Sequence, residues 1–301
     1  MDYSDVFIIP QKSLRSRSEV DLSTTLGKIN LEPPIISANM NSITGYDMCK
    51  AMWLNGGIGA LHRAQPVEQQ ISILEKLAEE KIQAIGTIGL KQGLEDAKKI
   101  LSAGTTTILL DVANAYNDEV AKLVYQIKND MPEVYLVVGN VATRKGLEFL
   151  MMAGADCAKV GIGNGAVCST KLVTGVNYPI VESVVETTQY PKLLPVIADG
   201  GVRQFGDVAK ALALGADYVM SGYLFKNCEE ALGGTYWGMA SKKGIGNKNH
   251  IEGFEVDAVK TTNVEKVMQQ LKAGLSSAFS YSGAKNIKEF HEKSEVGIKH
   301  S

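Results

Sequence analysis

The sequence lacks most of the features that mark secreted, membrane or nucleic-acid-binding proteins. Its 301 residues include only four cysteines, without a CxxC pair: Cys49, Cys157, Cys168 and Cys228. This usage excludes a disulfide-stabilised scaffold and favours a reduced protein of the cytoplasm. No apolar run reaches membrane-spanning length, and the opening MDYSDVFIIPQKS carries acids too early for a signal peptide. Because the 31 basic and 33 acidic residues nearly balance, we expect neither nucleic acid nor a membrane surface as a partner.

Short apolar runs alternate with stretches of helical period along the chain. Runs such as TILLDVA and VYLVVGNV are typical of parallel strands that are buried on both faces. Eight such runs are present: Pro34–Met40, Gly57–His62, Gln83–Gly89, Thr107–Ala113, Val134–Val141, Cys157–Gly163, Leu194–Gly201 and Tyr218–Leu224. Helical candidates between them include Val67–Lys81, Leu94–Leu101, Asn117–Asn129, Arg144–Ala153 and Phe205–Ala213. Eight alternations without a linker predict a single α/β domain over residues 1–301, a (β/α)8 TIM barrel, more readily than a doubly wound open sheet.

The segment KVGIGNGAVCST follows the sixth run and combines glycines with a cysteine. The glycines at 161, 163 and 165 permit positive φ, so the backbone can turn sharply and point carbonyls at a ligand or a monovalent cation. Cys168 stands at the end of this loop beside the hydroxyls of Ser169 and Thr170. A cysteine at a barrel strand end favours a nucleophile over an inert thiol, because the active sites of TIM barrels lie at the C-terminal ends of the strands.

Two further strand ends carry polar residues or glycines. IADGG ends the seventh run and Gly222 ends the eighth, where barrels commonly bind phosphate through backbone N–H groups. Asp199 would repel a phosphate, so we expect it to accept hydrogen bonds from a ribose diol, with a purely structural carboxylate as the alternative. Asp111 and Asn114 end the fourth run and would hold another sugar or a carboxamide, or else open a local turn. Glu252 lies in a C-terminal flap, where it is either a proton acceptor for Thr170 or a solvated acid.

Taken together, these segments resemble the IMP dehydrogenase/GMP reductase family over nearly the whole chain. The most specific pieces are DVFIIPQKSLRSRSEVDL near the start, GIGNGAVCST and IADGG. The family's fold is the (β/α)8 barrel, in agreement with the strand pattern. The resemblance implies that Cys168 attacks C2 of a purine nucleotide and that hydride moves between C2 and a nicotinamide. In the reductase branch NADPH converts GMP to IMP with loss of ammonia, and Thr170 and Glu252 match the residues that handle the proton.

The resemblance also assigns binding residues by position. Positions that match cofactor contacts are Ser16, Arg17, Arg63, Asp111, Val112, Ala113, Ile162, Gly163 and Met239. Positions that match nucleotide contacts are Asp199, Gly200, Gly201, Gly222, Tyr223, Gly238, Met239, Ala240, Glu252 and Gly253. The carbonyls of Gly163, Gly165 and Cys168 match a K⁺ site. Family members are generally tetramers in which the cofactor reaches a neighbouring subunit, so the resemblance implies a homotetramer.

Three features favour the reductase branch over the dehydrogenase branch. LDVANAY is similar to the reductase version of the fourth strand end, the chain has no room for an inserted regulatory domain, and residues 239–252 contain neither the arginine nor the tyrosine that dehydrogenases use as a pair. Departures from the family pattern are Asn41 for Asp, Arg63 for Lys, Asn164 for Pro, Tyr223 for Gly, Ala240 for Ser, and Asn249 and Ser276 for Arg. These departures leave two alternatives open: an IMP dehydrogenase or a reductase of a related purine nucleotide, and a nucleotide-binding protein with little turnover.

Overall fold

The main sheet is a ring of parallel strands. The computed structural model describes residues 1–14, 16–238, 241 and 253–299. Within them the strands of this sheet follow the order β5-β4-β11-β10-β9-β8-β7-β6. Their bounds are Ile35–Ser37 (β4), Ile58–Gly59 (β5), Gly86–Ile88 (β6), Thr107–Asp111 (β7), Tyr135–Val141 (β8), Cys157–Val160 (β9), Val196–Asp199 (β10) and Tyr218–Ser221 (β11).

The two outer strands of that order are joined to each other, which closes the barrel. A parallel bridge pairs Ala60, just after β5, with Ile85, just before β6. The amide of Ile85 donates to the carbonyl of Gly59 at 2.9 Å, and the amide of Leu61 donates to the carbonyl of Ile85 at 3.0 Å. The predicted TIM barrel is therefore confirmed, and the open-sheet alternative is excluded. The strands are shorter than the predicted runs because residues such as Ala38, Asn39 and Met40 leave the sheet to line a cavity.

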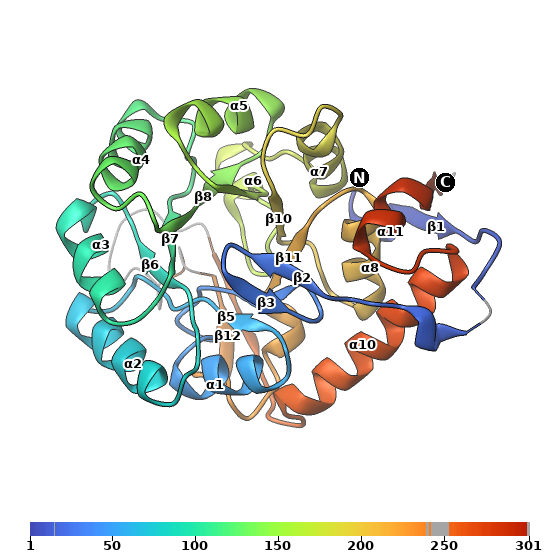
Figure 1. Cartoon of the computed structure of the whole chain (residues 1–301), viewed down its shortest axis with the longest axis horizontal. Coiled ribbons are helices and arrows are strands. Elements are labelled where there is room, and N and C mark those ends of the chain that lie inside the picture. Colours follow the sequence, from blue (N-terminus) through green and yellow to red (C-terminus); the bar gives the residue numbers. More distant parts are fainter. Residues whose placement is uncertain (15, 239–240, 242–252, 300–301) are drawn as a thin grey trace.

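Helices surround the ring of strands (Figure 1). Their bounds are Tyr46–Leu54 (α1), Val67–Glu79 (α2), Gly93–Ser102 (α3), Asp118–Asp130 (α4), Arg144–Ala153 (α5), Thr170–Thr174 (α6), Ile180–Thr188 (α7), Phe205–Ala213 (α8), Val264–Tyr281 (α10) and Ile287–Lys293 (α11). Helix α5 shows how particular residues determine where a helix begins and ends. Thr143 caps its start by accepting a hydrogen bond from the amide of Gly146, and Gly154 ends it with φ of 102°. Among the helices that the structure describes, none combines the length and the apolar character needed to cross a membrane.

A β-hairpin closes the N-terminal end of the barrel. It consists of β2 (Thr24–Leu26) and β3 (Ile29–Leu31), which lie across the centre of the ring in Figure 1. Its apolar side chains, Leu26, Ile29 and Leu31, are buried in one cluster with inward-facing residues of the strands. Because this end is plugged, a ligand can approach the strands only from the C-terminal end.

The two ends of the chain lie side by side, as Figure 1 shows. Strand β1 (Val6–Ile9) pairs antiparallel with β14 (Glu295–Ile298). The N-terminal segment also carries two 3-10 helices, η1 (Tyr3–Asp5) and η2 (Arg17–Glu19). A third, η3 (Tyr223–Phe225), follows β11, and a second hairpin joins β12 (Thr235–Trp237) to β13 (Glu255–Asp257) at the C-terminal end of the barrel.

Candidate active site

A cavity of about 580 Å³ opens at the C-terminal ends of the barrel strands. Pockets for small molecules commonly measure 300–1,000 Å³, so this cavity can hold a nucleotide. Most of the site residues expected from the sequence line it: Arg63, Asp111, Val112, Ala113, Ile162, Gly163, Gly165, Cys168, Thr170, Asp199, Gly200, Gly201, Gly222, Tyr223 and Gly238. They come from loops that are far apart in the sequence, and the barrel brings them to one place.

The loop between β9 and α6 can follow its path only because glycine stands at two sharp turns. Gly161 has φ of 137°, and a Cβ atom there would lie 2.1 Å from the backbone oxygen of Asp199. Gly163 has φ of 83°, and its Cβ would lie 2.6 Å from Oδ1 of Asn177. A side chain at either position would clash, so the glycines let this loop approach the neighbouring strand end closely.

Asn164, which replaces the family's proline, fastens the same loop through hydrogen bonds. Its side-chain amide donates to the carbonyls of Ile162 at 3.1 Å and Tyr178 at 3.0 Å. Its backbone carbonyl accepts from the amide of Gly201 at 2.9 Å, which ties the cysteine loop to the IADGG turn. A proline would fix the local backbone dihedral but would supply no side-chain donor. Asparagine at this position therefore lacks the rigid ring of proline but adds two side-chain hydrogen bonds.

Cys168 differs from the other three cysteines in its exposure. Its side chain is half-buried and lines the cavity, and its thiol donates to Oγ1 of Thr170 at 3.2 Å. Cys49, Cys157 and Cys228 are buried, and burial raises the pKa of each thiol, to about 12 for Cys228. A thiol must lose its proton to act as a nucleophile, so burial disfavours the other three. Cys168 is the cysteine that a ligand in the cavity can reach.

The hairpin of β12 and β13 lies against the cysteine loop. An isolated antiparallel bridge pairs Cys168 with Gly253, and the amide of Phe254 donates to the carbonyl of Val167 at 3.1 Å. Gly238 lies so close that a Cβ atom there would be 2.8 Å from the carbonyl oxygen of Val167. Gly238 and Gly253 thus lie beside the cysteine loop, and their expected contact with the nucleotide stays a prediction. Three other expected site residues, Met239, Ala240 and Glu252, lie outside the described residues.

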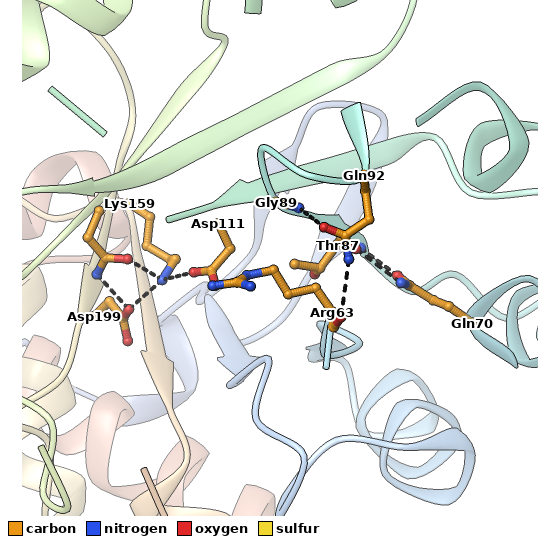
Figure 2. Close-up of polar contacts among 9 residues, drawn as sticks. Arg63, Gln70, Thr87, Gly89, Gln92, Asp111, Lys159 and Asp199 are labelled. Carbon is orange, nitrogen blue, oxygen red and sulfur yellow. Dashed lines mark hydrogen bonds and ion pairs between the residues drawn. The ribbon is translucent and has the colours of Figure 1, made fainter. Parts of the chain in front are cut away.

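A polar network crosses the inner end of the cavity, and Lys159 is at its centre (Figure 2). The ammonium nitrogen of Lys159 lies 2.7 Å from Oδ2 of Asp199, 3.0 Å from Oδ1 of Asp111 and 2.6 Å from Oδ1 of Asn140. Asn140 in turn donates to Asp199 at 2.9 Å, and Nε of Arg63 donates to the other oxygen of Asp111 at 3.2 Å. Positive and negative groups alternate along this network, so each buried charge has a partner.

The network holds its charged groups in their ionised forms. Burial on its own would lower the pKa of Lys159, but the carboxylates of Asp199 and Asp111 outweigh it, and the pKa is raised. Burial would likewise raise the pKa of Asp111, but the cations of Lys159 and Arg63 outweigh it, and the pKa is lowered. Both groups therefore stay charged at neutral pH although they are shielded from water.

Arg63, Val112 and Ala113 line both the main cavity and a smaller hollow of about 330 Å³. Figure 2 shows the contacts that hold Arg63 in place: the side chain of Gln92 donates to the carbonyl of Arg63 at 3.2 Å and accepts from the amide of Gly89 at 3.0 Å. The two spaces together offer room for a ligand longer than a mononucleotide.

Two of the expected cofactor residues do not line this cavity. Ser16 and Arg17 belong to the segment of η2 on the outside of the barrel, where Ser16 caps η2 and Arg17 reaches the hydroxyl of Tyr281 on α10 at 3.4 Å. Within one chain they do not contribute to the cavity. A cofactor contact by these two residues stays a prediction and requires a neighbouring subunit.

Two tyrosine side chains line the part of the cavity after β11. Tyr223 lines the cavity and packs edge-on against Tyr236, with ring centroids 6.2 Å apart. Gly222 is confined there, because a Cβ atom would lie 2.8 Å from the sulfur of Met40 and 3.1 Å from the hydroxyl of Tyr236. Asn41, another departure, accepts a hydrogen bond from the indole of Trp237 at 2.7 Å. Asn41 and Trp237 thereby join the loop after β4 to the end of β12.

Lys159 and Asn140 are two polar residues of the site to which no motif in the sequence assigns a role. Lys159 is the lone charge in the buried strand CAKV, and Asn140 stands near the end of VYLVVGNV. Burying a lysine in a strand that is apolar on both faces costs free energy unless the lysine is paired with an acid. The lone lysine in CAKV therefore indicates a buried ion pair. Its partners come from β7, β8 and β10, and the sequence alone does not show which of them it meets.

Comparisons with known proteins agree with this architecture. The IMP dehydrogenase / GMP reductase domain matches residues 1–299. GMP reductases of Oceanobacillus iheyensis, Bacillus thuringiensis subsp. konkukian and Streptococcus suis are 32%, 33% and 31% identical to this chain. Each similarity covers 100% of this chain and 96%, 96% and 95% of the respective relative. The chain belongs to the IMP dehydrogenase/GMP reductase family of oxidoreductases.

Proposed function

We propose that this protein is a GMP reductase, which converts GMP to IMP and ammonia with NADPH as the reductant. The observation that carries the proposal is the placement of Cys168: its half-buried thiol contacts Thr170 inside a cavity that also contains the IADGG turn and the Arg63–Asp111 pair. We infer that each of these two polar regions binds one reactant, with the nucleophile in the same cavity.

The nucleotide would occupy the side of the cavity formed after β10 and β11. Asp199 would accept hydrogen bonds from the ribose diol, because Lys159 and Asn140 bind its Oδ2 and no described residue donates to its Oδ1. The amide of Gly222 would receive the 5′-phosphate, in the position where barrels commonly bind this group, whereas the amide of Gly201 already donates to the carbonyl of Asn164. The purine would then extend toward Cys168.

The residues on the opposite side fit a nicotinamide cofactor. Asp111 presents an ionised carboxylate for a ribose, Arg63 adds a positive charge, and Val112 and Ala113 line both the main cavity and the adjoining hollow. These residues, with Ile162 and Gly163 of the cysteine loop, would hold NADPH beside the purine. The bound cofactor supplies the hydride that replaces sulfur at C2.

The residues of this chain act by covalent catalysis, in which Cys168 is the nucleophile. The thiolate of Cys168 attacks C2 of the purine, and the C2 amino group takes up a proton and leaves as ammonia. After C2 has gained a hydride, the bond between C2 and sulfur breaks, and IMP and the thiolate are released. Thr170, in contact with the thiol, and Glu252 would transfer the proton. A covalent adduct helps because it converts a stable aromatic amidine into a centre that can expel ammonia.

Two observations support the reductase over an IMP dehydrogenase. Residues 239–252 contain no arginine and no tyrosine, so the pair that dehydrogenases use to hydrolyse their adduct is missing. The relatives compared above carry the name GMP reductase and match this chain over its full length. A dehydrogenase would instead form XMP from IMP, and product analysis separates the two reactions.

We further propose a cytoplasmic homotetramer that K⁺ activates. The loop carbonyls partly fit such a cation: Gly163 and Cys168 line the cavity, whereas the carbonyl of Gly165 already accepts a hydrogen bond from the amide of Cys168 at 3.0 Å. The tetramer would bring Ser16 and Arg17 of one subunit to a cofactor bound by another. Sedimentation analysis and turnover measured in K⁺ and in Na⁺ would test both statements.

The deciding experiment mixes the full-length protein with GMP and NADPH in potassium buffer and follows the absorbance of the reduced nicotinamide. We expect GMP-dependent oxidation of NADPH, with IMP and ammonia formed in equal amounts. Cys168→Ala should lower turnover by about 10⁴-fold or more, because covalent catalysis is lost.

The matched control is Cys157→Ala, which removes a buried cysteine at the opposite end of the barrel. It should retain turnover. Formation of XMP from IMP, or binding of GMP without any oxidation of NADPH, would contradict the proposed reductase. The first result would identify a dehydrogenase and the second a nucleotide-binding protein.

A further inference from the structure

Lys159 has a role in the cavity that the covalent chemistry does not use. Its side chain is only 3% exposed, and its ammonium group makes three polar contacts, with Asp111, Asp199 and Asn140. A lysine ammonium has three N–H donors. All three are therefore engaged by the protein, and Lys159 has no donor left for a ligand. Any effect of Lys159 on binding must act through its partners.

The partners of Lys159 lie on successive strands of the barrel. Asp199 ends β10, Lys159 lies on β9, Asn140 lies on β8 and Asp111 ends β7, and these four strands are neighbours in the sheet. One cation thus connects the carboxylate proposed for the nucleotide ribose with the carboxylate proposed for the cofactor. Asp111 has a second cation in Arg63, but Lys159 is the cation that ion-pairs with Asp199 among the described residues.

Removal of this cation would leave two carboxylates in one shielded cavity. Like charges in a poorly hydrated site cannot both remain ionised and fixed in place, so one carboxylate would take up a proton or turn away. A protonated or displaced carboxylate is a poorer acceptor for ribose hydroxyls. The loss should be greater at Asp199 than at Asp111, because Asp111 keeps its contact with Arg63.

We propose that Lys159 is the positioning residue for both reactants: it orients Asp199 for the nucleotide and Asp111 for the cofactor. This inference rests on the proposed function, because it takes the two carboxylates as the ribose-binding groups of that reaction. Lys159 touches neither reactant. Its contribution is to fix the acceptor atoms in the free protein, so that binding needs no rearrangement of charge.

The test measures binding rather than turnover. Isothermal titration of the full-length protein with IMP, and separately with NADPH, should show IMP binding about 100-fold weaker in Lys159→Met and NADPH binding about 10-fold weaker. Lys159→Arg, which keeps the charge, should recover most of the IMP affinity. The control Lys128→Met removes a lysine on the outer face that pairs with Asp156 at 2.8 Å, and it should leave both affinities unchanged.

A double-mutant cycle distinguishes positioning from a general loss of structure. If Lys159 acts through Asp199, adding Lys159→Met to Asp199→Asn should weaken IMP binding no further. Should Lys159→Met alone fail to fold, the comparison of Asp199→Asn with the charge-balanced double variant still tests this point. A further tenfold loss in the double variant, or normal IMP binding by Lys159→Met, would overturn this inference alone. Failure of the wild-type protein to bind GMP or IMP would overturn the proposed function as well.

Discussion

The two ends of the barrel are built from the same strands but from different chemistry. Strand β9 shows the contrast within four residues: it begins with Cys157, buried in the apolar cluster beside the β2–β3 hairpin, and Lys159 near its other end joins the charged network. At the hairpin end, Tyr218 donates a hydrogen bond to the carbonyl of Thr25 and thereby attaches the hairpin to β11. At the other end the loops turn on glycines and expose polar groups to a cavity.

This contrast separates stability from function. Apolar side chains at the hairpin end stabilise the fold by being removed from water, and any loss of their volume lowers the free energy of unfolding. Side chains at the cavity end include buried charges, and the ion pairs of the network offset the cost of removing these charges from water. Substitutions at the hairpin end should therefore affect unfolding first, whereas those at the cavity end should affect turnover first.

Among the substitutions that test this contrast between the two ends, Gly161→Ala at the cavity end should have the largest effect. The new methyl group would lie 2.1 Å from the backbone oxygen of Asp199, at a φ that L side chains rarely adopt. The loop must move, and a displacement of about 1 Å at a catalytic group can lower turnover by about 100-fold. We expect that loss in GMP-dependent NADPH oxidation. Gly206→Ala, where nothing lies within 4 Å of the added Cβ, is the control and should keep normal turnover.

The converse test is Leu26→Ala in the hairpin. Leu26 is fully buried among the inward-facing barrel residues, so its truncation should lower the free energy of unfolding by about 2–5 kcal/mol. Turnover at a temperature where the variant stays folded should be unchanged. Urea unfolding followed by circular dichroism measures the loss, and the exposed Leu54→Ala gives the baseline. A loss of turnover in folded Leu26→Ala would contradict the conclusion that the hairpin end contributes to stability and the cavity end to turnover.

Much of the fold could be predicted from the sequence because its signals are local. Helices Arg144–Ala153 and Phe205–Ala213 have the predicted bounds, since a capping residue or a terminal glycine marks their limits. The strands were predicted too long, because an apolar run does not show where the backbone leaves the sheet. The pairing of β1 with β14 joins residues almost 300 positions apart, and no local pattern indicates it.

The site was predictable where a loop carries its own signature. The glycines and Cys168 occur in one short segment, and they line the cavity together. The role of Lys159 could not be predicted from the sequence because it depends on contacts with Asp111 and Asp199. Only the closed barrel brings these carboxylates within 3.0 Å of the ammonium group. The reverse holds for Arg17, whose expected cofactor contact is not made within one chain.

The smallest expected effect concerns His62 and the response of the cavity end to pH. His62 follows β5, its side chain is 8% exposed, and no described residue bonds to its Nδ1. Burial lowers its pKa from 6.5 to about 4. The unfolded chain therefore binds a proton more readily than the folded chain between pH 6.5 and 4, and stability falls as the pH is lowered through this range.

At pH 5.5 the contribution of His62 to this loss should be about 1 kcal/mol, and it should vanish above pH 7.5. His62→Gln, which stays neutral at every pH, should remove it. Urea unfolding of both proteins at pH 7.5 and at pH 5.5 isolates the effect, because the carboxylates titrate alike in each. If the two proteins lose the same stability between these pH values, His62 is not held neutral by burial. The acid sensitivity of the cavity end would then come from its carboxylates alone.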